Sequence, residues 1–253
     1  MNRALLLMLL SVNAMAAMTS KKIPYEIEKT KFEGVLVFDD AAKNLPGLVL
    51  VPNWLGINDA NIKQAELVAA RGYVVFVADM YGINARPKNQ EEAGKVATAV
   101  KGNRTLMRER VNMGLQMLLA AKAPMNPKRV GAIGFCFGGT AALELARSGA
   151  KISGAVSFHG GLSSPTPEDA KKITARVLAL HGADDPYVPA EEVAAFQAEM
   201  RAAKVDWELV SFGNAVHSFT DVDANTQGKA QYNAVVAARA YALMDSFLGE
   251  AFK

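Results

Sequence analysis

The chain has 253 residues, of which 51% are hydrophobic and 21% are charged, and its formal net charge is +3. This length and composition are sufficient for one sizeable domain with a substantial core. The small net charge and the lack of long Lys or Arg blocks argue against a nucleic-acid-binding protein.

The first 17 residues have the layout of a secretory signal peptide. Arg3 precedes an apolar run over residues 4–10, and small residues follow at the positions that signal peptidases require. The apolar run is too short for a comfortable transmembrane helix, although an uncleaved leader or membrane anchor is the alternative. We therefore expect residues 1–17 to be a signal peptide cleaved near Ala16 or Ala17. The mature protein would then be exported, to the periplasm, without a stable membrane anchor.

Apolar runs bounded by turn residues alternate with amphipathic stretches along the rest of the chain. The predicted strands are Ile23–Thr30, Phe32–Phe38, Gly47–Val51, Tyr73–Ala78, Arg129–Phe135, Ile152–Phe158, Ala175–Leu180 and Trp207–Phe212. The predicted helices are Asn58–Arg71, Arg104–Ala121, Thr140–Arg147, Ala190–Ala203 and Ala230–Leu248. Pro124 and Pro127 are expected to break the chain before its fifth strand, and residues 84–104 show no clear periodicity.

This alternation predicts one α/β domain over residues 18–253, with a mostly parallel sheet flanked by helices on both faces. In such sheets ligands bind beyond the carboxyl ends of the strands. Residues directly after the strands are therefore the candidates for a functional site.

The only cysteine of the chain, Cys136, lies in the sequence Gly-Phe-Cys-Phe-Gly between a predicted strand and a predicted helix. A G-x-C-x-G segment in this setting is typical of a nucleophile elbow, with Cys in place of Ser. The glycines allow a tight turn and a close approach of strand and helix. The positive end of the helix dipole would favour a thiolate at Cys136. A buried cysteine beside a tight turn is the structural alternative.

A catalytic acid and base should follow the nucleophile in that order along the chain. His217 lies in a loop before the last helix, where the base is expected. Asp185 is the candidate acid in HGADDPYVP, while Asp184 is expected to order the loop. The other two histidines, His159 and His181, follow strands, and we expect them to pack or hydrogen-bond beneath the site.

Two backbone N–H groups are candidates for an oxyanion hole. The N–H of Phe137 follows the nucleophile, and the N–H of Trp54 lies in the loop after the strand Gly47–Val51. The Trp54 side chain is a candidate for a pocket wall or for simple packing. Asp79 and Tyr81, at the end of another strand, are candidates to line the pocket, with structural roles equally in view.

These segments resemble the dienelactone hydrolase family of α/β-hydrolases over nearly the whole chain after the signal peptide. The matching stretches, in order, are KFEGVLVFDD, LPGLVLVPNWLGIN, VADMYG, IGFCFGG, HGADDPYVP and AVHSF. The cysteine elbow is the most specific of them, since most α/β-hydrolases have serine there. The resemblance implies an α/β-hydrolase fold with Cys136 as nucleophile, His217 as base and Asp185 as the residue that orients it.

Three positions depart from the pattern of well-studied members. Those members carry a Glu that contacts the resting thiol, where this chain has Asn53. They also hold a substrate carboxylate with two arginines, where this chain has Ile83, with Arg86 nearby, and Asp221. The carboxylate clamp is therefore missing or rebuilt, and dienelactone itself is a doubtful substrate.

The sequence thus predicts a hydrolase that cleaves an ester or lactone through a Cys-His-Asp triad and an acyl-enzyme thioester. Two alternatives are a non-catalytic exported binding protein on the same fold and a redox-responsive thiol protein. No metal-ligand spacing and no dinucleotide fingerprint are present, so we expect no metal and no cofactor. The expected partner is a small ester or lactone substrate, and the expected oligomeric state is a monomer.

Overall fold

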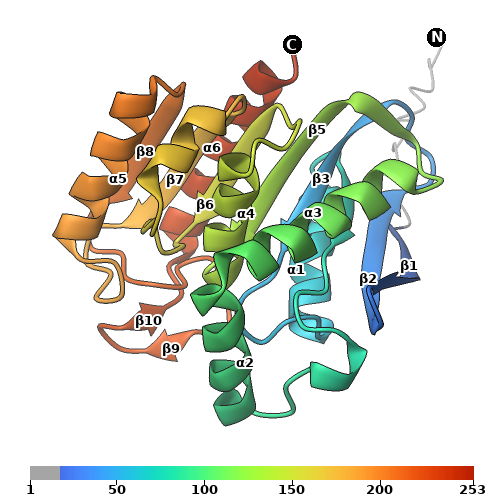
Figure 1. Ribbon diagram of the computed structural model, residues 1–253, viewed down its shortest axis with the longest axis horizontal. Helices are drawn as coiled ribbons and strands as arrows, with labels where there is room; N and C mark the ends of the chain where they lie inside the picture. Colours follow the sequence, from blue (N-terminus) through green and yellow to red (C-terminus); the bar gives the residue numbers. More distant parts are fainter. Residues whose placement is uncertain (1–17) are drawn as a thin grey trace, which may run out of the picture.

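A computed structural model describes residues 18–253, so the predicted signal peptide lies outside the described residues. An eight-stranded sheet runs through this part of the chain in the order β1-β2-β4-β3-β5-β6-β7-β8 (Figure 1). Its strands are β1 (Met18–Ile27), β2 (Thr30–Asp39), β3 (Leu45–Val51), β4 (Val74–Val77), β5 (Met125–Phe135), β6 (Gly154–Phe158), β7 (Arg176–Gly182) and β8 (Trp207–Phe212). All pairs from β4 to β8 are parallel, and β1 and β2 add an antiparallel edge.

Helices cover both faces of the sheet, as the alternating sequence pattern predicts. The α-helices are α1 (Asp59–Ala69), α2 (Gln90–Gly102), α3 (Arg104–Ala120), α4 (Phe137–Arg147), α5 (Ala190–Ala203) and α6 (Ala234–Ala251). Two 3₁₀ turns are η1 (Ile83–Ala85) and η2 (Pro167–Lys172). Helices α3, α4 and α5 pack on one face, and α1 and α6 pack on the other (Figure 1).

The central strand β3 shows why its sequence is continuously apolar. Leu48 and Leu50 pack into the core beneath α1 and α6, whereas Val49 and Val51 pack into the core beneath α3 and α4. All four side chains are 0% exposed. A strand that is buried on both faces cannot alternate with polar residues, so the run GLVLV is the expected signature of this position.

The segment that the sequence left without a prediction contains helix α2. Asn89 caps its first turn by accepting a hydrogen bond from the Glu92 N–H at 2.9 Å. Only Ala93, Ala97 and Val100 are buried along the helix, so its apolar stripe is narrow. These buried residues are small, so the segment lacks the large apolar side chains by which a helix face is recognised in a sequence.

Several predicted boundaries were wrong. The first strand ends at Ile27 rather than Thr30, which already belongs to β2, and α4 begins at Phe137 rather than Thr140. Pro127 does not break the chain before β5 but lies within it, where the pairing with β3 shifts between Leu45 and Gly47. The last helix does not begin at Ala230. Residues 230–231 form β10, a short strand paired with β9 (Asn225–Thr226), and α6 starts only after Asn233, whose side chain caps it.

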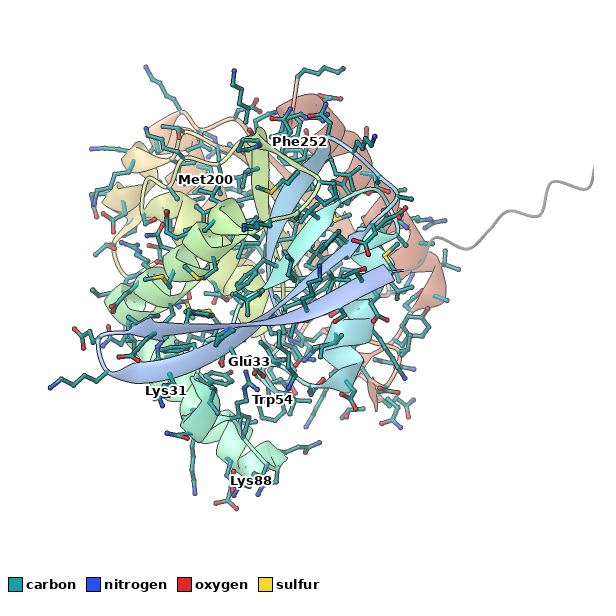
Figure 2. The ribbon with its side chains drawn as sticks, turned by 90° about the vertical axis from the view of Figure 1, so that its right-hand side faces the viewer. Lys31, Glu33, Trp54, Lys88, Met200 and Phe252 are labelled. Atoms are coloured by element: carbon teal, nitrogen blue, oxygen red, sulfur yellow. The ribbon has the colours of Figure 1, made fainter. Side chains whose placement is uncertain are left out.

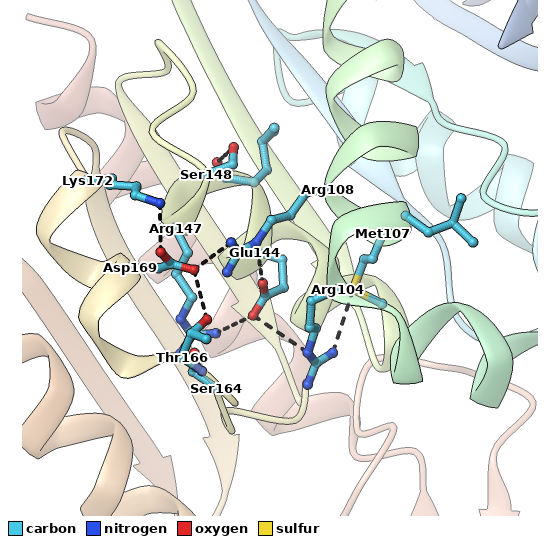
Figure 3. Close-up of polar contacts among 12 residues, drawn as sticks. Arg104, Met107, Arg108, Glu144, Arg147, Ser148, Ser164, Thr166, Asp169 and Lys172 are labelled. Carbon is cyan, nitrogen blue, oxygen red and sulfur yellow. Dashed lines mark hydrogen bonds and ion pairs between the residues drawn. The ribbon is translucent and has the colours of Figure 1, made fainter. Parts of the chain in front are cut away.

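Helix α4 is buried along its whole length, including its two charged residues, Glu144 and Arg147. Arg147 donates to Glu144 at 3.1 Å and to Glu199 of α5 at 2.6 Å. Arg108 of α3 donates to Glu144 at 2.7 Å and to Asp169 of η2 at 2.6 Å (Figure 3). Buried charges require such partners. The network therefore fixes α3, η2 and α5 against α4, and with them the start of α4.

Candidate active site

Cys136 forms the turn between β5 and α4, as the sequence predicts. Its backbone has φ 55° and ψ −118°, a conformation that non-glycine residues rarely adopt. The flanking glycines make this turn possible. A Cβ on Gly134 would overlap the carbonyl oxygen of Gly138, and a Cβ on Gly138 would overlap the carbonyl oxygen of Val51. The strand, the turn and the helix therefore approach one another closely enough to present the thiol at the carboxyl edge of the sheet.

A buried histidine supports this turn from below. The N–H of Cys136 donates to the carbonyl oxygen of Phe158 at 3.0 Å and to Nδ1 of His159 at 3.2 Å. The other ring nitrogen of His159 lies 2.8 Å from the hydroxyl of Thr220. Burial keeps the pKa of His159 well below its usual value, and the nearby His217 lowers it further. His159 is thus a neutral packing and hydrogen-bonding group beneath the site, the role expected from the sequence.

His217 and Asp185 form a hydrogen-bonded pair beside Cys136. The Nδ1 of His217 lies 2.8 Å from Oδ2 of Asp185. The other carboxylate oxygen of Asp185 accepts from the Tyr187 N–H at 2.8 Å, and the Tyr187 ring stands edge-on to the imidazole. Burial opposes the charge on His217, but its hydrogen bonds to Asp185 and Cys136 prevail and raise its pKa to about 10. The imidazole is therefore oriented by the carboxylate and held as an imidazolium near neutral pH.

The loop of His217 is held by the short hairpin that the sequence did not predict. The N–H of His217 donates to the carbonyl oxygen of Lys229 at 3.2 Å. The carbonyl oxygen of His217 accepts from the Gln231 N–H at 2.9 Å. The hairpin β9–β10 thus fixes the backbone on which the imidazole stands.

Both predicted oxyanion donors lie around the same cavity as Cys136 and His217. Phe137 is the first residue of α4, so its N–H has no acceptor within the helix. Trp54 lies in the loop after β3, and within residues 18–253 no hydrogen bond engages its N–H. Figure 2 shows Trp54 at the end of the molecule where Lys88, just before α2, also lies. Phe137 and Trp54 thus both line the cavity that contains the thiol, and within residues 18–253 neither N–H donates a hydrogen bond.

This cavity has a volume of about 600 Å³, and Cys136, Phe137, Trp54 and His217 all line it. One face of α2 forms a further part of its wall, through residues that include Thr98 and Lys101. None of its lining residues is an Asp or Glu, and Lys101 is the one Lys or Arg among them. No sequence pattern pointed to Lys101, because α2 itself was not predicted.

Tyr81 and Arg86, two of the residues proposed from the sequence for the pocket, do not line this cavity. Arg86 donates to the buried carboxylate of Asp79 at 3.0 Å and to the carbonyl oxygen of Glu33 at 2.6 Å. Tyr81 is 2% exposed, and its hydroxyl donates to the carbonyl oxygen of Trp54 at 2.8 Å. Both side chains therefore lie beneath the loops that surround the cavity.

Asn53 and Asp221, the other two residues proposed for the pocket, contact each other. The Nδ2 of Asn53 lies 3.5 Å from Oδ2 of Asp221. Its Oδ1 accepts from Asn61 at 2.9 Å and from the Leu55 N–H at 3.1 Å. Neither residue is among those that line the cavity with Cys136. The carboxylate of Asp221 thus faces Asn53 and adds no negative side chain to the cavity wall.

The remaining histidine, His181, lies at the end of β7 and is 5% exposed. Burial lowers its pKa, while the nearby carboxylates of Asp185 and Glu192 act in the opposite direction. Within the described part of the chain, no three His, Cys, Asp or Glu side chains gather as ligands for a metal ion.

Comparisons with known proteins agree with this architecture. Residues 32–252 match the family model described as "Dienelactone hydrolase family". The crystal structure of P91, described as a dienelactone hydrolase-like promiscuous phosphotriesterase from metagenomic libraries, is 38% identical with a TM-score of 0.87. That alignment covers 94% of this chain and 100% of P91.

More distant proteins show the same relationship. Dienelactone hydrolase from Anabaena variabilis shares the fold, with 19% identity, a TM-score of 0.65, and 92% and 98% of the two chains covered. A carboxymethylenebutenolidase homolog from Xenopus tropicalis is 25% identical over 65% of this chain and 67% of its own. The chain therefore belongs to the dienelactone hydrolase family and is a hydrolase with the α/β-hydrolase fold.

Proposed function

We propose that this protein hydrolyses a carboxylic ester or lactone through a thioester on Cys136, assisted by His217 and Asp185. One observation carries the proposal: Cys136 and His217 line the same cavity. Cys136 stands on a turn with positive φ at the N-terminus of α4, and Nδ1 of His217 lies 2.8 Å from Oδ2 of Asp185. This is the arrangement that nucleophilic catalysis by cysteine requires.

The first half-reaction forms the acyl-enzyme. Cys136 attacks the carbonyl carbon as a thiolate, while the Cys136 proton resides on His217. The carbonyl oxygen becomes an oxyanion that the N–H groups of Phe137 and Trp54 stabilise, each by about 3 kcal/mol in comparable sites. The C–O bond then breaks, and His217 gives its proton to the leaving alkoxide. Asp185 holds the imidazole in the required tautomer throughout.

The second half-reaction releases the acid. His217, now neutral, takes a proton from water, and the resulting hydroxide attacks the thioester. The oxyanion again lies between the same two N–H groups, and the thiolate of Cys136 leaves. Because a thiolate leaves more readily than an alkoxide, the first tetrahedral intermediate reverts when the alcohol is a poor leaving group. Activated esters, enol esters and lactones are therefore the favoured substrates.

The charge of the cavity favours a substrate that carries an anionic group. Lys101 is the lysine of the cavity wall, which contains no Asp or Glu. The carboxylate of Glu192, which lies beside Gly161 of this wall, accepts hydrogen bonds from the N–H groups of Leu162 and Ser163. The family resemblance places carboxylate-binding arginines at positions occupied here by Ile83 and Asp221. Asp221 contacts Asn53 and is not among the residues that line the cavity. Lys101 on α2 thus supplies a cation for the substrate carboxylate from a different element.

The test is hydrolysis of paired p-nitrophenyl esters by the wild-type protein and by Cys136→Ala. One ester of each pair is neutral, and the other ends its acyl chain in a carboxylate. We expect wild-type turnover of both, a preference for the carboxylate ester that Lys101→Met reduces, and no turnover above background with Cys136→Ala. Turnover that survives in Cys136→Ala would refute the proposal.

The two alternatives give different outcomes in the same measurement. A non-catalytic binding protein would bind esters without turning them over. A redox-responsive protein would show no esterase activity but reversible oxidation of Cys136, and it would lack an internal resolving thiol because the chain has one cysteine.

A further inference from the structure

Two buried side chains tie the loop that carries Trp54 to the body of the protein. Asn61 of α1 donates to the carbonyl oxygen of Gly56 at 2.8 Å, and Tyr81 holds the peptide group after Trp54. The Tyr81 hydroxyl donates to the carbonyl oxygen of Trp54 at 2.8 Å. That carbonyl belongs to the peptide group between Trp54 and Leu55, whose N–H donates to Oδ1 of Asn53 at 3.1 Å. The two polar ends of one peptide plane are therefore fixed from opposite sides. The Trp54 N–H belongs to the preceding peptide plane, between Asn53 and Trp54. The two planes share the Cα atom of Trp54, so the orientation of one constrains the other.

The ring of Tyr81 contacts the other half of the predicted oxyanion hole. Its centroid lies 5.8 Å from that of Phe137, with a tilt of 45° between the rings. The same ring also packs against the turn after Trp54, since a Cβ on Gly56 would lie only 3.0 Å from it. The buried side chain of Tyr81 thus contacts both residues that supply the predicted oxyanion donors.

Tyr81 is itself held rigidly. The carboxylate of Asp79 accepts the N–H groups of Tyr81 and Gly82, both at 3.0 Å. Arg86 neutralises this carboxylate at 3.0 Å, and Asp79 is 1% exposed. A continuous set of buried contacts thus runs from Arg86 through Asp79 to Tyr81.

We propose that Tyr81 is a positioning residue that sets the spacing of the two oxyanion donors, and that Asp79 and Arg86 hold it in place. This inference rests on the proposed function, because an oxyanion hole is useful only where a thiolate adds to a carbonyl. Donors fixed before the reaction need no reorganisation when charge develops on oxygen. Small misplacements of such groups slow the reaction strongly.

The test separates oxyanion stabilisation from reactivity of the thiol. Tyr81→Phe removes the hydroxyl and keeps the ring. Tyr73→Phe is the matched control, because the Tyr73 hydroxyl is also buried and donates to Asp245 at 3.3 Å, away from the cavity. Both variants and the wild type are titrated with an alkyl trifluoromethyl ketone. Cys136 sulfur forms a bond to the ketone carbon, the C=O electron pair moves to oxygen, and the proton stays on His217.

We expect Tyr81→Phe to weaken ketone affinity about tenfold and to lower kcat for a p-nitrophenyl ester about tenfold, with KM within about twofold. Alkylation of Cys136 by iodoacetamide should change less than about twofold, because displacement at a saturated carbon creates no oxyanion. Tyr73→Phe should match the wild type in all three measurements.

Three results would overturn the inference: wild-type ketone affinity in Tyr81→Phe, an alkylation rate that falls as much as the ketone affinity, or a wild-type protein that does not bind the ketone. Failure of the proposed function would give a different combination of ester hydrolysis and ketone affinity. If the wild type hydrolysed no ester while the ketone affinities changed as expected, hydrolysis would be refuted and the positioning role of Tyr81 would stand.

Discussion

Cys136 occupies a backbone conformation that costs on the order of 1–3 kcal/mol. The surrounding structure maintains it, because its N–H is shared between Phe158 and His159, and because glycines stand two residues before and two residues after it. Strain of this kind clusters where a side chain must be presented rather than packed. The single thiol thus lies at the junction of strand and helix, where the helix dipole and His217 both act on it.

The charge of His217 sets the pH dependence of Cys136 reactivity. Because the pKa of His217 is raised to about 10, the imidazolium beside the thiol persists across neutral pH and is lost as the pH rises through about 10. We expect iodoacetamide to alkylate Cys136 at pH 6 about tenfold faster in the wild type than in His217→Ala. The difference should shrink as the pH approaches 10.

The unfolded proteins in concentrated urea provide the control for this comparison, since they should be alkylated at equal rates. Equal rates in the folded proteins at pH 6 would show that His217 does not act on the thiol.

At this scale the sequence predicted which residues would lie near one another, but not which contacts they make. Strand ends and chain order were enough to select Cys136, Asp185 and His217, because the strands of a parallel sheet bring their carboxyl ends to one edge. The pairing of Asn53 with Asp221 joins residues 168 positions apart, and no local pattern encodes it. Nor could the sequence show that Tyr81 points beneath the loop rather than into the cavity.

Helix α4 places the thiol, and the buried ion pairs around it determine how firmly the helix is held. Removing one partner of a buried pair leaves a charge without compensation in a medium that solvates it poorly. Glu144 and Arg147 are 0% exposed, so water cannot replace a lost partner there.

We expect Glu199→Gln to lower the free energy of unfolding by about 3 kcal/mol, measured by urea denaturation. The double variant Arg147→Met with Glu199→Leu should lose less free energy of unfolding than Arg147→Met and Glu199→Leu lose in sum, because it removes both charges.

Glu91→Gln is the surface control. Its partner Lys95 lies at 2.6 Å, but the two side chains are 78% and 73% exposed, so the change should be below about 0.5 kcal/mol. Additive losses in the double variant would contradict this account of the network.

Elements with large apolar residues and clear end signals were predicted well, whereas elements without them were not. Helix α5 was placed at its observed ends, Ala190 and Ala203, because its apolar spacing and the preceding Pro189 mark both its face and its start. Helix α2 and the hairpin β9–β10 escaped prediction, since both are short of apolar residues. These two elements contribute to the cavity wall and to the placement of His217, so the least regular parts of the sequence complete the site.

At the scale of the whole molecule, the N-terminal segment bears on where the protein acts. We propose that the protein is exported and functions as a periplasmic monomer, as the layout of residues 1–17 suggests. The first strand begins at Met18, so cleavage after Ala16 or Ala17 would leave the sheet complete. Over residues 18–253, no helix combines the length and the apolar character needed to span a membrane.

Expression of the full chain in a Gram-negative bacterium tests this proposal. The protein recovered from the periplasmic fraction should begin at Ala17 or Met18 by intact mass and N-terminal sequencing, and light scattering should give the mass of a monomer. A full-length chain that keeps Met1 and stays in the cytoplasm would contradict export. A mass of twice the chain would contradict the monomer.

The central claim is that the acyl group of the substrate passes through the sulfur of Cys136. The most direct measurement is acid quenching of the wild-type protein within milliseconds of mixing with a p-nitrophenyl ester, followed by peptide mass spectrometry. We predict that the peptide containing Cys136 gains the mass of the acyl group, that the adduct is released by hydroxylamine as a thioester, and that it disappears as turnover ends. Turnover with no adduct on Cys136, or with the acyl group on another residue, would contradict the mechanism.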